Sequence, residues 1–131
     1  MLNLQTIKII PYDNLELKHL DYVYAAQREL RRIYGGDTML MTGQISYLFC
    51  ETPDEIYGCI VFHSSGHNKI WIQTIYVNAD QREKGIMRLM LDELRVYLPD
   101  YTFALSTAVT NKRMQKAMNC LGWDERVIQY E

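Results

Sequence analysis

Residues 69–87 read KIWIQTIYVNADQREKGIM, an apolar run followed by a polar segment, a glycine and a new apolar pattern. Residues 70–77 are almost unbroken in β-branched and aromatic side chains, which is typical of a central strand covered on both faces. After the glycine the apolar residues recur at helical spacing, at Ile86, Leu89, Met90, Leu94 and Tyr97. The pattern therefore predicts a buried strand over 69–77, a polar loop, and a helix over 84–97 that Pro99 stops.

Upstream of this segment the sequence predicts one strand, one helix and two more strands. A β-branched run predicts the first strand over about 5–10, and Asn14 can cap the helix that follows. This helix is expected to end at Gly35-Gly36. Its apolar stripe consists of Leu20, Val23, Ala26, Leu30 and Ile33. Strand formers over 46–51 and 55–63 complete, with the strand described above, an antiparallel meander.

Downstream, strands are predicted over 101–108 and 127–130, with a helix over 111–120 between them. The order of elements is thus β-α-β-β-β-α-β-α-β. The strand, helix and strand between residues 69 and 108 form a crossover, and the two strands of such a unit are parallel. The predicted fold class is therefore α/β, more closely an α+β arrangement in which a mixed sheet carries helices on its faces.

The composition predicts one domain over residues 1–131. The chain has 131 residues, of which 48% are apolar, and this is enough for a core without disulfides or a structural metal. Lys plus Arg number 14 and Asp plus Glu number 16, so the formal net charge is −2. A dedicated nucleic-acid binder would show a strong basic excess, and no nucleic-acid partner is expected.

The cysteines and histidines predict neither a disulfide framework nor a metal site. They are Cys50, Cys59, Cys120, His19, His63 and His67, and they fall in no metal-ligand spacing. The N-terminus carries no basic stretch before an apolar run, and no apolar stretch approaches the ~20 residues that span a bilayer. Neither secretion nor membrane insertion is expected, and the expected setting is the reducing cytoplasm.

Residues 78–87 are the part of the sequence that points to chemistry. Gly85 stands in the first turn of the predicted helix, where glycine costs roughly 1 kcal/mol relative to alanine, so a functional reason is worth considering. Free backbone N–H groups and the positive end of a helix dipole bind phosphate, and Arg82 and Lys84 add positive charge. The alternative is a plain solvated turn with an incidental glycine.

Two motifs resemble those of the GNAT family of N-acetyltransferases. Residues 82–87, REKGIM, resemble the family's Q/R-x-x-G-x-G/A motif, which follows a central strand and binds acetyl coenzyme A. The offsets of the family's N-x-x-A-x-x-L-Y-x-x-x-G-F helix are met by Asn111, Met114, Ala117, Met118 and Gly122-Trp123. The order of elements over residues 5–130 is also that of the family. The resemblance implies a GNAT-like acyl-CoA N-acyltransferase fold.

The resemblance also implies where acetyl coenzyme A, the cosubstrate, binds. It would lie in a V-shaped opening between the strands at 69–77 and 101–108, and its pantetheine would pair with the backbone near Ile75 and Val77. The cofactor-binding residues implied beyond these two are Arg82, Glu83, Lys84, Gly85, Ile86, Met87 and Asn111, of which those from Glu83 to Met87 cradle the pyrophosphate with backbone N–H groups. The implied function is direct transfer of the acetyl group to a primary amine.

By the same resemblance, Trp71 and Gln73 occupy central-strand positions where some relatives carry a histidine or glutamate base. Neither side chain can serve as a base, so Gln73 is a weak catalytic candidate that would at best order a water. The alternative, which the usual behaviour of buried amides favours, is that Gln73 bridges strands. The donor for the tetrahedral oxyanion would be a backbone N–H near Val77.

Two methionines depart from the family pattern. Met118 stands where the family usually has a tyrosine that protonates the leaving thiolate, and a thioether has no proton to give. Met87 replaces a second small residue, and its side chain could fill space meant for the cofactor or turn into the core. The sequence therefore leaves two interpretations, an N-acetyltransferase and a catalytically inactive GNAT-fold binding or assembly module.

The acceptor is not specified by the sequence. An aromatic and thioether-rich set surrounds the first predicted helix and comprises Tyr22, Tyr24, Tyr34, Met39, Met41, Tyr47 and Tyr57. These residues could line a pocket for a small-molecule or peptide amine, form the face of a homodimer, or simply pack in the core. The cluster of Arg28, Arg31 and Arg32 is more often a solvated face than a site for an acidic substrate.

Overall fold

The computed structural model describes residues 6–11, 14–34, 45–64, 68–82, 84–108 and 124–128. The elements in chain order are β1 (Thr6–Pro11), α1 (Leu17–Tyr34), β2 (Ile45–Glu51), β3 (Ile56–Ser64), β4 (Lys69–Val77), η3 (Ala79–Gln81), α2 (Ile86–Tyr97), β5 (Thr102–Ala108) and β6 (Asp124–Ile128). The predicted strands and both predicted helices that fall within these ranges are present. The helix predicted over 111–120 lies outside the described residues.

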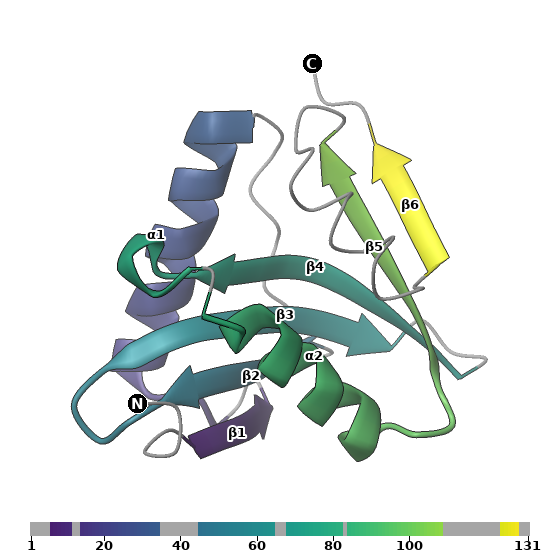
Figure 1. The fold of residues 1–131 in the computed structure, drawn as a ribbon, viewed down its shortest axis with the longest axis horizontal. Coiled ribbons are helices and arrows are strands. Elements are labelled where there is room, and N and C mark those ends of the chain that lie inside the picture. The colour runs from purple at the N-terminus through teal and green to yellow at the C-terminus, as the bar shows by residue number, and fades with distance from the viewer. Residues whose placement is uncertain are drawn as a thin grey trace.

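The described strands form one mixed sheet in the order β1-β2-β3-β4-β5-β6. β1 to β4 pair as an antiparallel meander, as predicted for the last three of them. The chain then passes through α2, and β5 pairs with β4 in parallel, also as predicted. β6 adds to β5 in parallel. Figure 1 shows how β5 and β6 rise away from the other four strands.

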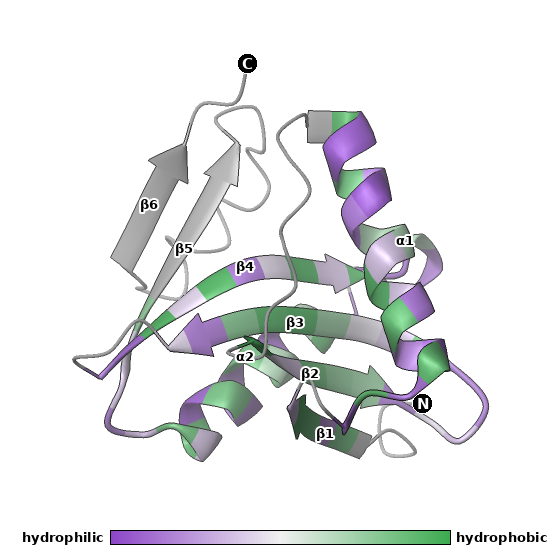
Figure 2. Ribbon diagram, turned by 180° about the vertical axis from the view of Figure 1, so that it is seen from behind, coloured by the Kyte–Doolittle hydropathy of each residue, from purple (hydrophilic) through white to green (hydrophobic). Residues whose placement is uncertain are grey.

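The two helices cover opposite faces of the sheet, as Figures 1 and 2 show from the two sides. On the α2 face, the buried residues of the helix are Ile86, Met90, Leu91 and Leu94, and they join the larger core cluster. On the α1 face, Val23 packs against a second cluster that includes Tyr47 and Phe49 of β2. Each amphipathic helix thus buries its apolar stripe on one face of the same sheet.

β4 departs from the strict alternation of a strand. Ile72 and Ile75 both belong to the α2-face cluster although they are three positions apart. The reason is a β-bulge, since Phe62 of β3 pairs with Ile72 and the next pair in register is Val61 with Thr74, which leaves Gln73 as an extra residue of β4. A bulge of this kind increases the local twist of the strand and re-aims its side chains.

Several predicted boundaries are wrong by a few residues. α1 begins at Leu17, so Asn14 is not its cap, and the carbonyl of Glu16 accepts the first helical N–H groups instead. α2 begins at Ile86, two residues later than predicted, because Gly85 has a left-handed conformation and precedes the helix. β6 spans 124–128 where 127–130 was predicted.

The predicted apolar stripes are also too long. Ile33 and Tyr97 are 49% and 59% exposed, and each stands in the last turn of its helix, beyond the residues that pack on the sheet. Neither of the two described helices is long and apolar enough to cross a membrane.

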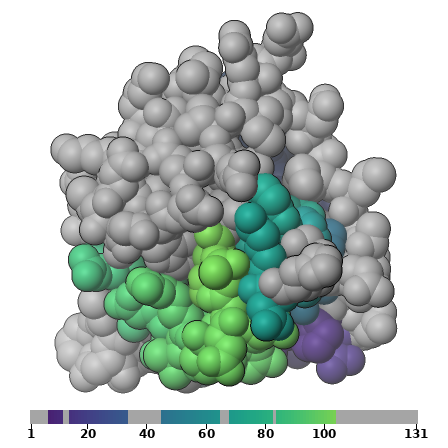
Figure 3. Space-filling view, turned by 90° about the vertical axis from the view of Figure 1, so that its right-hand side faces the viewer, coloured from purple at the N-terminus to yellow at the C-terminus, as the bar shows by residue number. Residues whose placement is uncertain are grey.

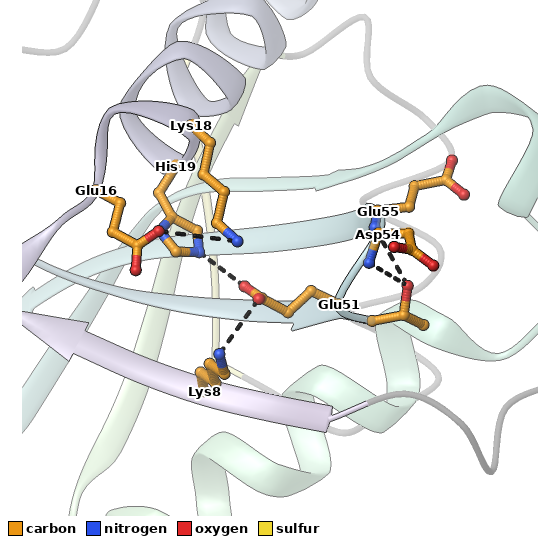
Figure 4. A network of polar contacts seen from close by, with 8 residues as sticks. Lys8, Glu16, Lys18, His19, Glu51, Asp54 and Glu55 are labelled. Carbon is orange, nitrogen blue, oxygen red and sulfur yellow. Dashed lines mark hydrogen bonds and ion pairs between the residues drawn. The ribbon is translucent and has the colours of Figure 1, made fainter.

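A buried polar pair ties the start of α1 to the end of β2 (Figure 4). His19 Nε2 lies 2.8 Å from Glu51 Oε1, and both side chains are 2% exposed. Lys8 of β1 reaches the other carboxylate oxygen at 3.4 Å. His19 also packs against the ring of Phe49, with ring centres 4.4 Å apart. The pair therefore connects three elements inside the α1 face.

Candidate functional site

The pairing of β4 with β5 covers only the first part of β4. It runs from Lys69 opposite Thr102 to Ile72 opposite Leu105, and Figure 3 shows the start of β4 (teal) beside the residues that lead into β5 (light green). β4 continues to Val77 along β3, whereas β5 continues to Ala108 along β6. We call the point where the two strands separate, beyond Ile72 and Leu105, the β4–β5 fork. The separation predicted between these two strands is present there.

The backbone of β4 beyond the fork has one edge that β3 does not use. The N–H of Asn78 donates to the carbonyl of Tyr57 in β3 at 2.9 Å. Successive residues of a strand direct their N–H groups to opposite edges, so those of Ile75 and Val77 are directed away from β3. These are the two residues for which pantetheine pairing was predicted, and their orientation fits that role.

Asn78 fixes the loop that leaves β4. Its side-chain NH2 donates to the carbonyl of Ile56 at 2.8 Å, and its side-chain oxygen accepts from the hydroxyl of Tyr22 at 2.5 Å. Its carbonyl oxygen accepts the N–H of Gln81 at 2.8 Å, which closes η3. The loop therefore starts from a residue held by β3, α1 and its own first turn. Asn78 is not among the predicted site residues, although an asparagine directly after a strand is a usual turn residue.

Gly85 stands at the N-cap of α2 with φ +82° and ψ 10°. Side chains with a Cβ adopt this left-handed region at a cost, so the glycine is explained by its backbone conformation and not by the helix-propensity argument made from the sequence. A Cβ built on Gly85 would have no atom of the described residues within 4 Å. Within the described residues no side chain caps this helix end, and the N–H groups of Ile86 and Met87 have no intrahelical partner. The position is open, positively polarised and suited to an anion.

Arg82 lies between β4 and α1. Its Nε donates to the carbonyl of Val77 at 2.9 Å, and its Nη2 is 4.0 Å from Glu29 Oε2. Its guanidinium also lies over the ring of Tyr76, 5.5 Å from the ring centre. In the structure Arg82 thus pins the loop to the end of β4, and its side chain stays one-third exposed.

Glu29 accepts a hydrogen bond from the hydroxyl of Tyr76. Burial, and then this carboxylate, raise the pKa of Tyr76 to about 12. A third contact comes from Arg32, whose Nη2 is 4.0 Å from Glu29 Oε1. The sequence predicts no role for Glu29 or Tyr76, because their contact joins residues 47 positions apart.

The remaining predicted residues divide into three groups. Lys84 is exposed beside Gly85, where its charge is free to meet an anion in solution. Met87 is partly buried and packs against the α2-face core, so its side chain takes the second of the two orientations considered from the sequence. Glu83, Asn111 and Met118 lie outside the described residues.

Gln73 bridges two strands, as its favoured interpretation predicted. Its side-chain nitrogen Nε2 lies 2.9 Å from Nδ1 of His63 in β3. Its oxygen Oε1 is buried and has no hydrogen-bond partner among the described residues. The sequence pattern considers His63 only as a metal ligand. Its contact with Gln73 depends on the β-bulge, which cannot be recognised from the sequence.

The tyrosines near α1 do not form one surface. Tyr47 is fully buried in the α1-face core, whereas Tyr57 packs against the cluster on the opposite face. Tyr22 is bound to Asn78, and Tyr24 is 42% exposed. The interpretation as core packing therefore holds for Tyr47 and Tyr57, and these two cannot share a pocket or a dimer face.

The sequence model of a known family matches most of the chain. It is described as the acetyltransferase (GNAT) family, and it matches residues 12–123. A search of curated proteins finds no relative of this chain.

Solved structures with the same fold are similar over nearly the whole chain. A protein from Clostridium difficile 630, described as a possible acetyltransferase, has a TM-score of 0.71 at 16% identity and covers 98% of this chain and 96% of its own. An aminoglycoside N-acetyltransferase in complex with CoA has a TM-score of 0.66 at 16% identity, with 97% and 95% covered. A ribosomal-protein-alanine N-acetyltransferase from Brucella melitensis biovar Abortus 2308 has a TM-score of 0.65 at 18% identity, with 96% and 99% covered.

Proposed function

The chain belongs to the GNAT family of acetyltransferases, and we propose that it transfers the acetyl group of acetyl coenzyme A directly to a primary amine. The observation that carries this proposal is the path from the β4–β5 fork to Gly85. Along it, the N–H groups of Ile75 and Val77 are directed away from β3, and the path ends at an uncapped helix start with open space at Gly85. An extended arm with a diphosphate at one end fits both halves of this path.

The phosphate end of the cosubstrate would lie at Gly85. Backbone N–H groups at a helix start meet a pyrophosphate without depending on any side chain, and Lys84 adds a positive charge next to them. Alanine at Gly85 would be strained, since a Cβ at φ +82° is unfavourable, although the space for it exists. The conformation and not the volume of glycine is therefore what this site needs.

The thioester end would lie toward the fork. Held between the separated strands, it would present its carbonyl to the N–H of a β4 residue, which supports the negative oxygen formed when the amine attacks. Binding in this way supplies position and orientation, the two contributions that a backbone site provides best. The leaving thiolate would take its proton from solvent.

The proposed acceptor class rests on a chemical group that the acceptors named for two solved structures have in common. Those relatives are named for an aminoglycoside and for a protein alanine, and both present a primary amine. We therefore propose a primary amine on a small molecule or a peptide as the acceptor. A cytoplasmic setting fits the buried, reduced thiols of Cys50 and Cys59.

The packing of Met87 favours an enzyme over an inactive binding module. A methionine that projected over the helix start would obstruct a diphosphate, but this side chain joins the core instead. The test is incubation of the purified protein with acetyl coenzyme A and a panel of primary amines, followed by mass spectrometry of the amines. Acetylated product from at least one amine, absent with heat-inactivated protein, is expected. Cosubstrate binding with no product from any amine would instead indicate a binding module.

A further inference from the structure

We propose that His63 is the general base of the acetyl transfer and that Gln73 is the residue that positions it. This inference rests on the proposed function, because it assigns a residue to a reaction for which neither Trp71 nor Gln73 can take a proton. It concerns the end of the path opposite to Gly85, where the β4–β5 fork, the bulge in β4 and an unpartnered polar atom coincide.

Gln73 is the first residue of β4 beyond the fork. Pairing with β5 ends at Ile72, and Gln73 is the extra residue of the bulge against β3. From Val77 back to Gln73 is four residues, or about 13 Å along a strand. An arm anchored by its phosphates at Gly85 and running back along β4 would therefore bring its reactive end to Gln73.

The bulge directs Gln73 to the face on which His63 lies. Cys59 and Val61 of β3 pack in the α1-face cluster, and alternation along the strand places His63 on the same face. The contact between Gln73 Nε2 and His63 Nδ1 at 2.9 Å shows that both side chains are there. His63 is half-buried, so part of the residue stays accessible.

A glutamine can serve an imidazole in either of its neutral forms. With Nε2 of the amide toward Nδ1, the ring accepts and carries its proton on the other nitrogen. A half-turn of the amide puts Oε1 against an Nδ1–H and leaves the second ring nitrogen free to accept a proton. Because Oε1 has no hydrogen-bond partner among the described residues, the half-turn breaks no hydrogen bond of this oxygen. Oε1 can also accept from the charged ring, so Gln73 supports His63 after it has taken a proton.

The described side chains that share this face of the sheet with His63 supply no negative charge to it. On this face β2 presents Ile45, opposite His63, and Tyr47, while β4 presents Trp71 and Lys69. Lys69 Nζ lies over the ring of Trp71, 5.3 Å from its centre. On α1, Arg31 stands one turn beyond Gln27, which bonds Thr74. Neither strand places a carboxylate against His63.

Among the described residues, Glu29 is a second basic group near β4, and its carboxylate already has partners. Its carboxylate accepts from Tyr76 and lies 4.0 Å from the guanidinium nitrogens of both Arg82 and Arg32. It also lies beside Tyr76, near the end of β4, whereas the fork is at Ile72. His63 is thus closer to the fork than Glu29 and has fewer charged partners.

The transfer then balances as follows. The ammonium group of the acceptor gives one proton to the free nitrogen of His63, and the resulting amine attacks the thioester carbonyl carbon. The C–N bond forms and the C–S bond breaks, the second proton of the nitrogen passes through solvent to the thiolate sulfur, and His63 returns its proton to water. The products are an amide, a thiol and one proton.

The experiment follows the ring signals of His63 and His19 by NMR, assigned with the His63→Gln variant, while calorimetry measures acetyl coenzyme A binding. Saturating acetyl coenzyme A is expected to move the His63 signal and to leave that of the buried His19 in place. Gln73→Glu, whose carboxylate accepts only from Nδ1–H, is expected to hold the proton of His63 on Nδ1 and to move its ring signals in the protein without cosubstrate.

Turnover with ethylamine as the probe acceptor provides the kinetic test. His63→Gln should lower kcat by roughly 10²- to 10⁴-fold, the usual contribution of a general base, and leave the KM for acetyl coenzyme A unchanged. Cosubstrate binding without movement of the His63 signal, or full turnover by His63→Gln, overturns this assignment and spares the proposed function. Failure of acetyl coenzyme A to bind overturns both. Unchanged ring signals of His63 in Gln73→Glu overturn the role of Gln73.

Discussion

Arg82 Nε donates a hydrogen bond to the carbonyl oxygen of Val77 at 2.9 Å, and this contact ties the candidate phosphate loop to the end of β4. The same guanidinium lies 4.0 Å from Glu29 of α1. One side chain therefore connects the strand, the loop and the helix on the α1 face. Arg82 can therefore act in two ways, as a charge that attracts phosphate or as a side chain that holds the loop in shape. The effect of removing Arg82 on cosubstrate affinity should depend on salt only in the first case.

Arg82→Ala should weaken acetyl coenzyme A binding by about tenfold at low ionic strength and by much less at 0.5 M salt, because salt screens an exposed charge pair. Arg95→Ala is the matched control. It removes the same charge from the last turn of α2, about 15 Å along the helix from Gly85, and should leave affinity unchanged. A loss that is equal at both salt concentrations would contradict the phosphate role and leave Arg82 as a clamp.

Gly85→Asp and Gly85→Asn separate charge from conformation. The two side chains are nearly the same size, and both tolerate the left-handed region better than other residues do. Only the aspartate places a negative charge beside the proposed pyrophosphate, so its affinity should fall at least tenfold below that of the asparagine variant. Calorimetry with acetyl coenzyme A makes the comparison, and equal affinities would rule out phosphate binding at this helix start.

Glu51→Ala should lower the free energy of unfolding by about 3 kcal/mol, because it leaves His19 buried without its hydrogen-bond partner. Glu16→Ala is the control from the same close-up, where Glu16 directly precedes α1 (Figure 4). Its carboxylate is 68% exposed and pairs with Lys18 at 3.8 Å, so the loss should stay below about 1 kcal/mol. Urea unfolding followed by circular dichroism measures both, and similar losses would show that the buried pair contributes no more than a surface pair.

The thiols of Cys50 and Cys59 should resist alkylation in the folded protein. Burial raises the pKa of Cys50 to about 11, with a further contribution from Glu51, and burial raises that of Cys59 to about 12. The thiolate is the reactive form, so iodoacetamide at pH 8 should label peptides containing these residues only after unfolding. Rapid labelling of either peptide in native protein would contradict the burial.

The same thiols make stability fall at high pH. Their pKa values are raised in the folded state, so as pH rises from about 9 to 12 the unfolded chain loses these protons first. The contribution of the two buried thiols to the free energy of unfolding is fully present below pH 9 and is lost between about pH 9 and 12.

Much of the fold could be predicted because it follows from side-chain periodicity. β4 spans the predicted residues 69–77, since a run of β-branched and aromatic residues between polar loops has few other solutions. The antiparallel meander and the parallel crossover follow from short and long connections respectively. Ile33 and Tyr97 show the limit, because periodicity cannot tell where a helix extends past the sheet.

The site was less predictable because its key features depend on backbone conformation. The sequence indicates a glycine at position 85 but not its positive φ, and that angle ends the loop and starts α2 two residues later. The bulge at Gln73 reverses the alternation of β4, so strict period two would place Thr74 on the wrong face. The contacts of His63 and Glu29 depend on residues 10 and 47 positions away in the chain, which local patterns do not report.

Binding of acetyl coenzyme A by the wild-type protein is the most direct test of the central claim. Calorimetric titration should follow a mass measurement showing that no cofactor has copurified, with desulfo coenzyme A as the comparison ligand that lacks the thioester. We expect saturable binding of one acetyl coenzyme A per chain, retained in part by desulfo coenzyme A because it keeps the diphosphate that meets Gly85. Heats indistinguishable from dilution for both ligands would contradict the assignment of the β4–β5 fork and Gly85 as a cosubstrate site.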